Sequence, residues 1–285
     1  MKTRSPSYSP PLAGLALLLV LALLAAGCTQ PAADGPAQTL KITGSTTVLP
    51  VAQAAADAFM KDHATANIQV SGGGSGVGVQ AVGEGIAEIG MSSRDLKPEE
   101  RAKNPNLVVT TIANDGIAVI VHPGNRVPAL TLAQLKEIYA GTTTNWKDVG
   151  GPDMTIVVVG RDSASGTREF FSESVMKKQD FTPTQLEKNS NGAVKQTIAQ
   201  TPGAIGYVGL GYIDADIRPV PINVNNALVE PTIANVVAKT YPIARPLIMI
   251  TNGAPEGLAK TYLDYLLSPA GQAIVAEEGF VPITA

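Results

Sequence analysis

The sequence predicts an α/β protein with a largely parallel sheet, divided into two α/β units. The first observation is that short β-branched runs alternate with Ala-rich amphipathic stretches from Thr39 onward, a pattern typical of strands that alternate with helices. The second is that another set of such segments follows from Thr131. With 285 residues, 45% of them hydrophobic and 16% charged, the chain is long enough for two such units.

Residues 1–27 are predicted to form an export signal. Lys2 and Arg4 precede an uncharged Leu/Ala-rich run, Leu12 to Ala26, that closes on small residues. The run is shorter than the roughly 20 residues that span a bilayer. Charge, apolar run and small residues follow one another in the order typical of a signal peptide.

Cys28 follows this segment and is the only cysteine in the chain, which excludes an intramolecular disulfide. Its place after "LLAAG" resembles that of the acylated cysteine of lipoprotein signals. We therefore expect a lipid on Cys28 that anchors the protein at the outer face of the cell membrane or in the periplasm. Residues 28–38 are polar, contain Pro and Gly, and are predicted to form a tether.

The first unit is expected to begin near Thr39. Its segments are, in order, "TLKIT", "VLPVAQAAADAFMKD", "NIQVS", "VGVQAVGEGI", "AEIGMSS", "LVVTTIA" and "GIAVIVHP". The stretch "IVHPGNRVP" then leaves this unit through turn-forming Pro and Gly. The segments of the second unit are "TLAQLKEIYAG", "MTIVVVG", "REFFSESVMKK", "AVKQTIAQ", "GAIGYVG" and "RPVPI".

The C-terminal part is expected to return to the first unit. "YPIARPLIMIT" reads as an extended segment, because Pro disfavours helix in the residue before it. The tail that follows predicts two helices that need a sheet to cover. Lobe 1 would then consist of residues 39–122 and 246–285, and lobe 2 of residues 123–245. A chain that crosses twice between lobes forms a hinge with a ligand cleft between them.

Three loops of glycine and hydroxyl residues each follow a predicted strand and precede a predicted helix. Such loops leave backbone N–H groups unpaired at a helix N-terminus and add O–H donors. In the third loop Ser165, Gly166 and Thr167 would offer these donors to an oxyanion, and Arg161 would add charge and a planar pair of donors. Helix capping alone explains any one loop. The loops are "GSTT" at 44–47, "SGGGSG" at 71–76 and "GRDSASGT" at 160–167.

Composition and motifs argue against other classes of protein. The formal net charge is −3, and more negative without the leader, which disfavours nucleic acid as a partner. No G-x-x-x-x-G-K-[ST] or G-x-S-x-G motif occurs, and with two histidines and one cysteine we expect no metal or cofactor and no catalysis. One alternative stays open: Gly76, Gly78 and Ala81, with Asp95 downstream, match a relaxed dinucleotide-binding fingerprint.

The motifs together resemble those of the phosphate-binding lipoproteins of Pst-type phosphate ABC transporters. They are "GSTTVLPVAQAAADAF", "SGGGSGVGVQAV", "IGMSSRDL", "NWKDVGG", "GRDSASGTREFF" and "GAIGYVG", and the resemblance covers essentially the whole chain. It implies a type II periplasmic-binding-protein fold with two crossing strands and non-covalent phosphate binding in the cleft. The phosphate ligands that it implies are Ser45, Thr46, Ser75, the "SSR" stretch with Ser93 and Arg94, and then Arg161, Ser165, Gly166 and Thr167.

Two residues keep alternative interpretations. Some members of the family have an Asp that accepts the phosphate proton where this chain has Ser93 followed by Arg94. Asp115, before an apolar strand, is our candidate for that acceptor, although Asp-Gly is also an ordinary turn. An acceptor would favour phosphate over sulfate, which carries no proton at neutral pH. Arg94 would either bind the anion or pair with Asp95 or Glu99.

The resulting expectation is a monomeric, exported, lipid-anchored receptor that delivers inorganic phosphate to the permease subunits of an ABC transporter. The alternatives are a receptor for another oxyanion, such as sulfate, molybdate or tungstate, and a dinucleotide-dependent enzyme that uses the Gly76 fingerprint.

Overall fold

The structure, a computed structural model, describes residues 36–283, and the chain from Ala37 onward forms one compact unit. The predicted export signal, Cys28 and most of the predicted tether lie outside the described residues. Within residues 36–283, no helix combines the length and apolar character needed to cross a membrane.

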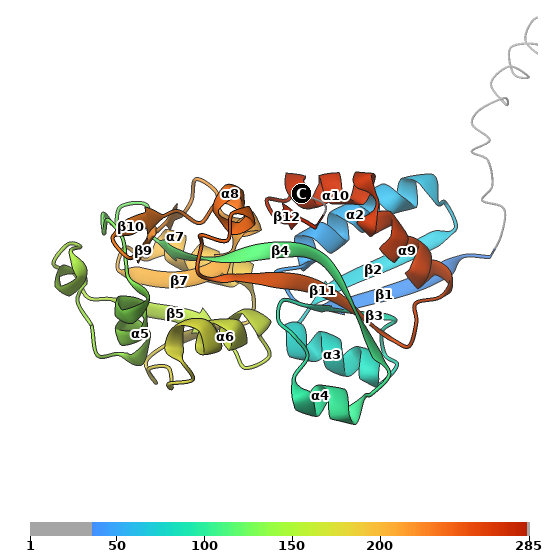
Figure 1. Cartoon of the computed structure of the whole chain (residues 1–285), viewed down its shortest axis with the longest axis horizontal. Helices are drawn as coiled ribbons and strands as arrows, with labels where there is room; N and C mark the ends of the chain where they lie inside the picture. Colours follow the sequence, from blue (N-terminus) through green and yellow to red (C-terminus); the bar gives the residue numbers. More distant parts are fainter. Residues whose placement is uncertain (1–35, 284–285) are drawn as a thin grey trace, which may run out of the picture. The chain divides into compact units, whose positions relative to one another are not determined.

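The first lobe contains three parallel strands with helices on both sides (Figure 1). Strand β1 (Gln38–Gly44) lies between β2 (Ala66–Gly72) and β3 (Ile89–Ser92) and is parallel to both. Two helices on one side are α3 (Ser75–Gly83) and α4 (Pro98–Lys103). The helices on the other side are α2 (Leu49–Asp62), α9 (Gly257–Leu267) and α10 (Pro269–Glu277).

The second lobe repeats this plan. Strand β5 (Val157–Arg161) is parallel to β6 (Leu186–Lys188) and to β7 (Ala204–Gly209). Its helices are α5 (Leu132–Ala140), η1 (Trp146–Val149), α6 (Gly166–Phe171), the π-helical η2 (Ser172–Met176), α7 (Asn191–Gln200), η3 (Leu210–Tyr212) and α8 (Ile233–Val237). The short strands of this lobe are β8 (Arg218–Pro219), β9 (Ile222–Val224) and β10 (Ala227–Val229). A last short strand, β12 (Val281–Pro282), pairs with β4 at Asn114 and Ala113.

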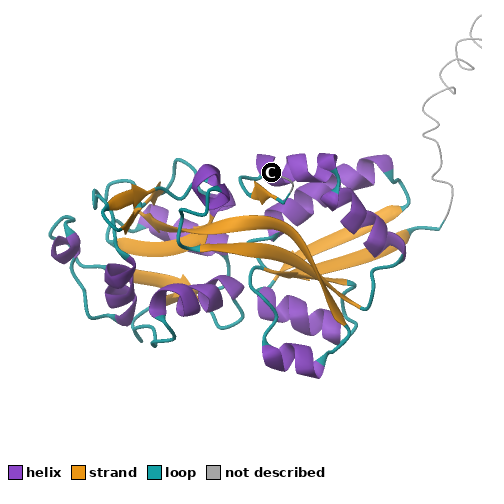
Figure 2. Cartoon of the chain, in the orientation of Figure 1, coloured by secondary structure: helices purple, strands orange, loops and turns teal. Residues whose placement is uncertain are grey.

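Two long antiparallel strands, β4 (Leu107–Val121) and β11 (Ala244–Asn252), run through both lobes (Figure 2). They join the strands in the order β2-β1-β3-β11-β4-β7-β5-β6. The sheet is therefore parallel at its two ends and antiparallel across its middle, whereas the sequence predicts a largely parallel one. The sequence also predicts two separate runs where β4 is continuous, because Asp115 and Gly116 pair with β11 rather than form a turn.

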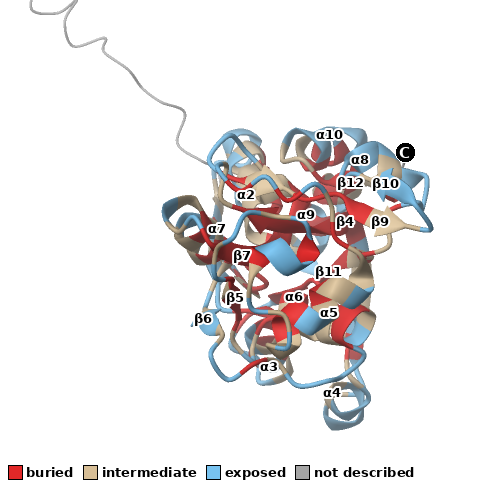
Figure 3. Cartoon of the chain, turned by 90° about the vertical axis from the view of Figure 1, so that its left-hand side faces the viewer, coloured by how far each residue is buried: buried red, intermediate tan, exposed pale blue. Residues whose placement is uncertain are grey.

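Each lobe has its own apolar core, and the crossing strands pass from one core to the other. Strand β4 contributes Ala113 to the first core and Ile117 to the second. Strand β11 likewise leaves the first core at Leu247, and the preceding Ala244 packs against the second. Figure 3 shows β4 and β7 buried and the outer faces of the helices exposed. The two-lobed fold with two crossing strands is confirmed, and the lobe boundaries named above stay predictions.

The crossing also determines where polar residues meet. Asp115 and Arg245 are register partners on β4 and β11, midway between the two cores. The carboxyl ends of β1 and β5 point toward this crossing from opposite lobes, and each is followed by one of the glycine and hydroxyl loops. Backbone topology thus brings loops about 120 residues apart in the sequence to one place.

Candidate functional site

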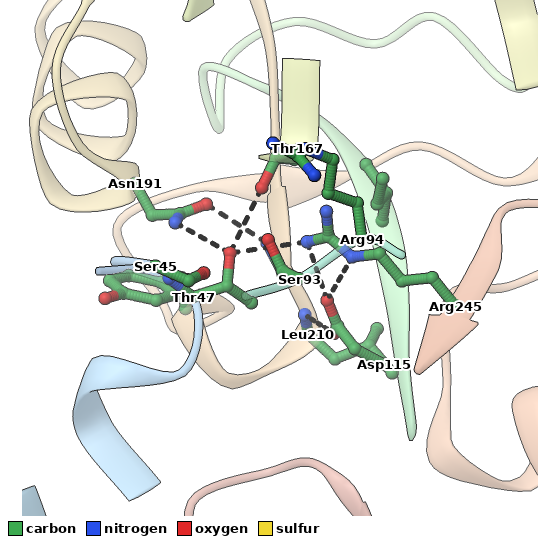
Figure 4. A network of polar contacts seen from close by, with 12 residues as sticks. Ser45, Thr47, Ser93, Arg94, Asp115, Thr167, Asn191, Leu210 and Arg245 are labelled. Carbon is green, nitrogen blue, oxygen red and sulfur yellow. Dashed lines mark hydrogen bonds and ion pairs between the residues drawn. The ribbon is translucent and has the colours of Figure 1, made fainter. Parts of the chain in front are cut away.

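Hydroxyl groups from the two lobes meet in a buried polar cluster (Figure 4). Thr47, after β1, lies 3.1 Å from Thr167 at the start of α6, measured between their Oγ1 atoms. Asn191, the first residue of α7, donates from Nδ2 to Oγ1 of Thr46 and of Thr47, each at 3.0 Å. We call Thr46, Thr47, Arg161, Thr167 and Asn191 the central cluster; all five side chains are buried.

The glycine loops allow the two lobes to approach closely. A Cβ on Gly166 would lie 2.2 Å from Oγ of Ser75, and one on Gly74 would lie 2.6 Å from the carbonyl oxygen of Ala164. Gly74 also has a φ of +100°, which side-chain-bearing residues rarely adopt. Small residues are therefore required on both sides of this contact. Ser45 and Ser165 are buried beside it, and Ser165 caps α6 by accepting the N–H of Arg168 at 3.2 Å.

Arg161, the last residue of β5, is the cation of the central cluster. The residue is 1% exposed. Its Nε donates to the carbonyl of Lys188 at 3.1 Å, and its Nη2 donates to the carbonyl of Asn189 at 3.2 Å and to Oγ1 of Thr46 at 3.3 Å. Burial lowers the pKa of the Arg161 guanidinium, yet arginine keeps its proton in proteins. No ion pair among residues 36–283 includes Arg161, so this buried charge has no carboxylate partner in the described chain.

Asp115 and Arg245 form a buried ion pair at the crossing of β4 and β11. Nη2 and Nε of Arg245 donate to Oδ2 of Asp115 at 2.9 and 3.2 Å. The N–H of Leu210 donates to Oδ1 at 2.9 Å. Burial raises the pKa of the Asp115 carboxyl, and the adjacent guanidinium opposes that rise. Asp115 is the one buried carboxylate among the described residues, and Arg245 links it to the central cluster by donating to Oγ1 of Thr47 at 3.3 Å.

Ser93 and Arg94, which follow β3, have different surroundings. Ser93 donates its N–H to Oγ of Ser75 at 3.1 Å and therefore lies beside the glycine loop. The guanidinium of Arg94 instead donates to both carboxylate oxygens of Glu100, at 2.8 and 2.7 Å, and to the carbonyl of Asp95 at 2.8 Å. The acidic partner of Arg94 is thus Glu100 and neither of the two carboxylates predicted.

The sequence analysis missed Thr47, Asn191, Tyr212 and Arg245. Tyr212 donates its hydroxyl to the carbonyl of Thr46, which adds another contact between the lobes. A signal existed for two of these residues. Thr47 belongs to the same "GSTT" loop as the predicted ligands, and Arg245 is the one charged residue in the apolar crossing segment "YPIARPLIMIT". Asn191 and Tyr212 occur in ordinary capping and turn sequences that carry no such signal.

The dinucleotide alternative depends on the glycines at the start of α3. The N–H of Gly76 donates to the carbonyl of Ala164 at 3.0 Å, so the second lobe covers this helix N-terminus. A Cβ on Gly78 would lie 2.7 Å from the carbonyl oxygen of Met91, which explains that glycine by the packing of α3 on β3. In the described part of the chain, no group of three or more His, Cys, Asp or Glu side chains could hold a metal ion.

Comparisons with known proteins agree with the two-lobed fold. A family model described as a PBP superfamily domain matches residues 29–270. The phosphate-binding protein PstS of Bacillus subtilis (strain 168) is 37% identical over 247 residues, which cover 86% of this chain and 81% of that protein. The phosphate-binding protein PstS of Borreliella burgdorferi is 33% identical over 254 residues, covering 86% of this chain and 90% of that protein.

Solved structures give the same result. A putative phosphate ABC transporter substrate-binding protein from Clostridium perfringens, with bound phosphate, superimposes with a TM-score of 0.81 at 39% identity and covers 86% of this chain and 100% of its own. An ABC-type phosphate transport receptor from Vibrio cholerae superimposes with a TM-score of 0.70 at 31% identity and the same coverage. The chain therefore belongs to the PBP superfamily and, within it, to the family of PstS phosphate-binding proteins.

Proposed function

We propose that this protein is an exported receptor that binds inorganic phosphate between its lobes and supplies it to the permease of an ABC transporter. The observation that carries anion binding is Arg161, a buried guanidinium that has no carboxylate partner in the described chain and donates to the hydroxyl of Thr46. A buried, unpaired cation is costly, and an oxyanion in contact with it offsets that cost. The ligands proposed with it are Ser45, Thr46, Ser75, Ser93, Ser165, Gly166 and Thr167.

The names of the relatives support phosphate over other oxyanions, and Asp115 gives a physical reason for that preference. Asp115 is a buried carboxylate that accepts hydrogen bonds from Leu210 and Arg245. In this proposal it also accepts the proton that phosphate carries and sulfate lacks. Sulfate would place an unprotonated oxygen against the carboxylate, which disfavours its binding.

Binding is coupled to closure of the lobes in this proposal. The central cluster takes Thr46 and Thr47 from one lobe and Arg161 and Thr167 from the other, so an anion that contacts all of them favours the closed arrangement. The lipid on Cys28 would keep the receptor beside its permease. A Cys28→Ser variant that stayed on membranes as firmly as the parent would contradict the anchor without affecting phosphate binding.

Calorimetric titration of the full chain tests the proposal. The protein is purified in mild detergent, stripped of anions by unfolding and refolding, and titrated with phosphate and sulfate at neutral pH. We expect tight phosphate binding and negligible sulfate binding, and an Asp115→Asn variant with a smaller preference for phosphate. Comparable sulfate binding by the parent would point to an oxyanion receptor of broader or different specificity. Binding of neither anion, together with binding of NAD, would favour the dinucleotide alternative.

A further inference from the structure

Arg245 has one donor group that its ion pair with Asp115 does not use. Its side chain is completely buried. Nε and Nη2 both donate to Asp115, and Nη2 also donates to Thr47. Nη1 is buried without any hydrogen-bond partner in the described part of the chain. Leaving an N–H of a charged group unpaired in the interior is costly, so this nitrogen calls for an acceptor.

The geometry of the guanidinium indicates where that acceptor lies. The group is planar, and one edge, formed by Nε and Nη2, faces Asp115. Nη1 therefore lies on the side away from the carboxylate, next to the Nη2 atom that reaches Thr47. Figure 4 shows this third nitrogen directed away from Asp115 and toward the side of Thr167. Thr47 and Thr167 come from different lobes, and their hydroxyls are in contact.

We propose that Arg245 is a second direct cationic ligand of the bound anion and donates to it from Nη1, while Asp115 holds the opposite edge of the guanidinium. This inference rests on the proposed phosphate-binding function. It assigns a ligand to the strand β11, outside all three glycine and hydroxyl loops. Arg161, at the end of β5, and Arg245, on the crossing strand β11, would then reach the anion from two different strands.

The pair also has a consequence for charge. Arg245 and Asp115 neutralise each other, so Arg245 adds a strong, charge-assisted donor without adding net charge to the site. Arg161 remains the source of net positive charge. Arg245 would therefore add a hydrogen-bond donor to the site, while Arg161 balances the charge of the anion.

The alternative is that Arg245 merely neutralises Asp115. Arg245→Lys distinguishes direct anion binding from mere neutralisation of Asp115. A lysine ammonium can still pair with Asp115, but it is a point charge without the planar fork of a guanidinium and cannot donate to Asp115 and to the anion in the same arrangement. We expect this variant to bind phosphate on the order of 10- to 100-fold more weakly, as for a lost hydrogen bond to a charged group. The matched control is Arg218→Lys, whose guanidinium donates to the carbonyls of Asn125 and Val127, and it should leave phosphate affinity unchanged.

A second pair of variants lacks the Asp115 carboxylate, so that Arg245 has no charge to neutralise. Asp115→Asn is compared with Asp115→Asn/Arg245→Met by phosphate calorimetry on the full chain, with thermal unfolding to verify folding. We expect the double variant to bind at least about tenfold more weakly than Asp115→Asn, because only Arg245 differs. Equal phosphate affinity in these two variants, or parent-like affinity in Arg245→Lys, would overturn the inference. A parent protein that binds no phosphate would instead overturn the proposed function itself.

Discussion

The two lobes meet through two kinds of contact. Comparing them distinguishes the residues that suit binding of the ligand from those that suit small changes in the free energy of lobe closure. In the central cluster the contacts are made by fully buried hydroxyl, amide and guanidinium groups. At the rim of the same contact Lys97 donates to Glu169 of α6 at 2.7 Å, and Arg94 lies 3.8 Å from the same carboxylate. We call Arg94, Lys97, Glu100 and Glu169 the rim cluster.

The two clusters differ in whether their hydrogen bonds can be replaced by hydrogen bonds to an anion. A hydroxyl both donates and accepts, so the contact between the hydroxyls of Thr47 and Thr167 can be replaced by two hydrogen bonds donated to an anion. The rim pair joins a lysine and a glutamate that are each about 30% exposed, at 32% for Lys97 and 29% for Glu169. Water and salt weaken such a pair. The centre therefore suits ligand recognition, and the rim suits small changes in the free energy of closure.

The largest effect is expected from the centre. Arg161→Ala removes the one buried cation without a carboxylate partner among the described residues, and phosphate binding should weaken by about 2 to 5 kcal/mol, as for other broken buried charge pairs. Calorimetry measures the change, and Arg101→Ala on the exposed side of α4 is the control for the altered net charge. Parent-like phosphate affinity in Arg161→Ala would contradict the assignment of the phosphate site to the central cluster.

A smaller effect is expected where the lobes approach across Gly166. Gly166→Ala introduces a Cβ that meets Oγ of Ser75 and so opposes closure, with a cost of about 1 to 3 kcal/mol in phosphate binding. Gly192→Ala is a matched control, because a Cβ there meets no atom within 4 Å. Small-angle scattering with and without phosphate should reveal a more open form for Gly166→Ala alone. Identical scattering for both variants would mean that the close approach of the lobes at Gly166 does not limit their closure.

The smallest effect is expected at the rim. Glu169→Gln removes the charge that Lys97 and Arg94 share across the lobes, and it should weaken phosphate binding by less than about 1 kcal/mol. The difference from the parent should shrink further at high salt. Glu173→Gln, whose only described partner is Lys178 of the same lobe, is the control. A loss as large as that of Arg161→Ala would place the rim inside the recognition site and erase the contrast between the two clusters.

Sequence patterns anticipated most of this fold for a physical reason. The β-branched apolar runs located the strands, and the helices α2, α3, α9 and α10 lie where amphipathic runs predicted helices. The three loops were recognisable because each has Gly, Ser or Thr between a strand and the N-terminus of a helix, and this arrangement is local in the sequence. The alternation of these runs also predicted two α/β units, and the resemblance to the Pst-type family implied the type II periplasmic-binding-protein fold, which the comparisons confirm.

Other features could not be predicted because they depend on pairing over long distances. The Asp-Gly dipeptide at 115 and 116 has the composition of a turn, and its place inside β4 follows from its ladder with β11, some 130 residues away. Arg245 and Asn191 enter the cluster for the same reason. Arg94 has several acidic neighbours in sequence, and only the capping geometry of α4 directs Glu100 toward it.

The division of the cores along the chain has a consequence for the order of folding. The core of the second lobe, apart from Val281, is drawn from one continuous stretch between Ile117 and Ile243. The core of the first lobe combines the stretch from Leu40 to Ala113 with residues Leu247 to Phe280. A growing chain completes the second lobe while the first still waits for α9 and α10, because domains fold as units once their residues are available. The lobe that comes first in the sequence is thus the last to be finished, and a truncation that removes α9 and α10 should unfold this first lobe.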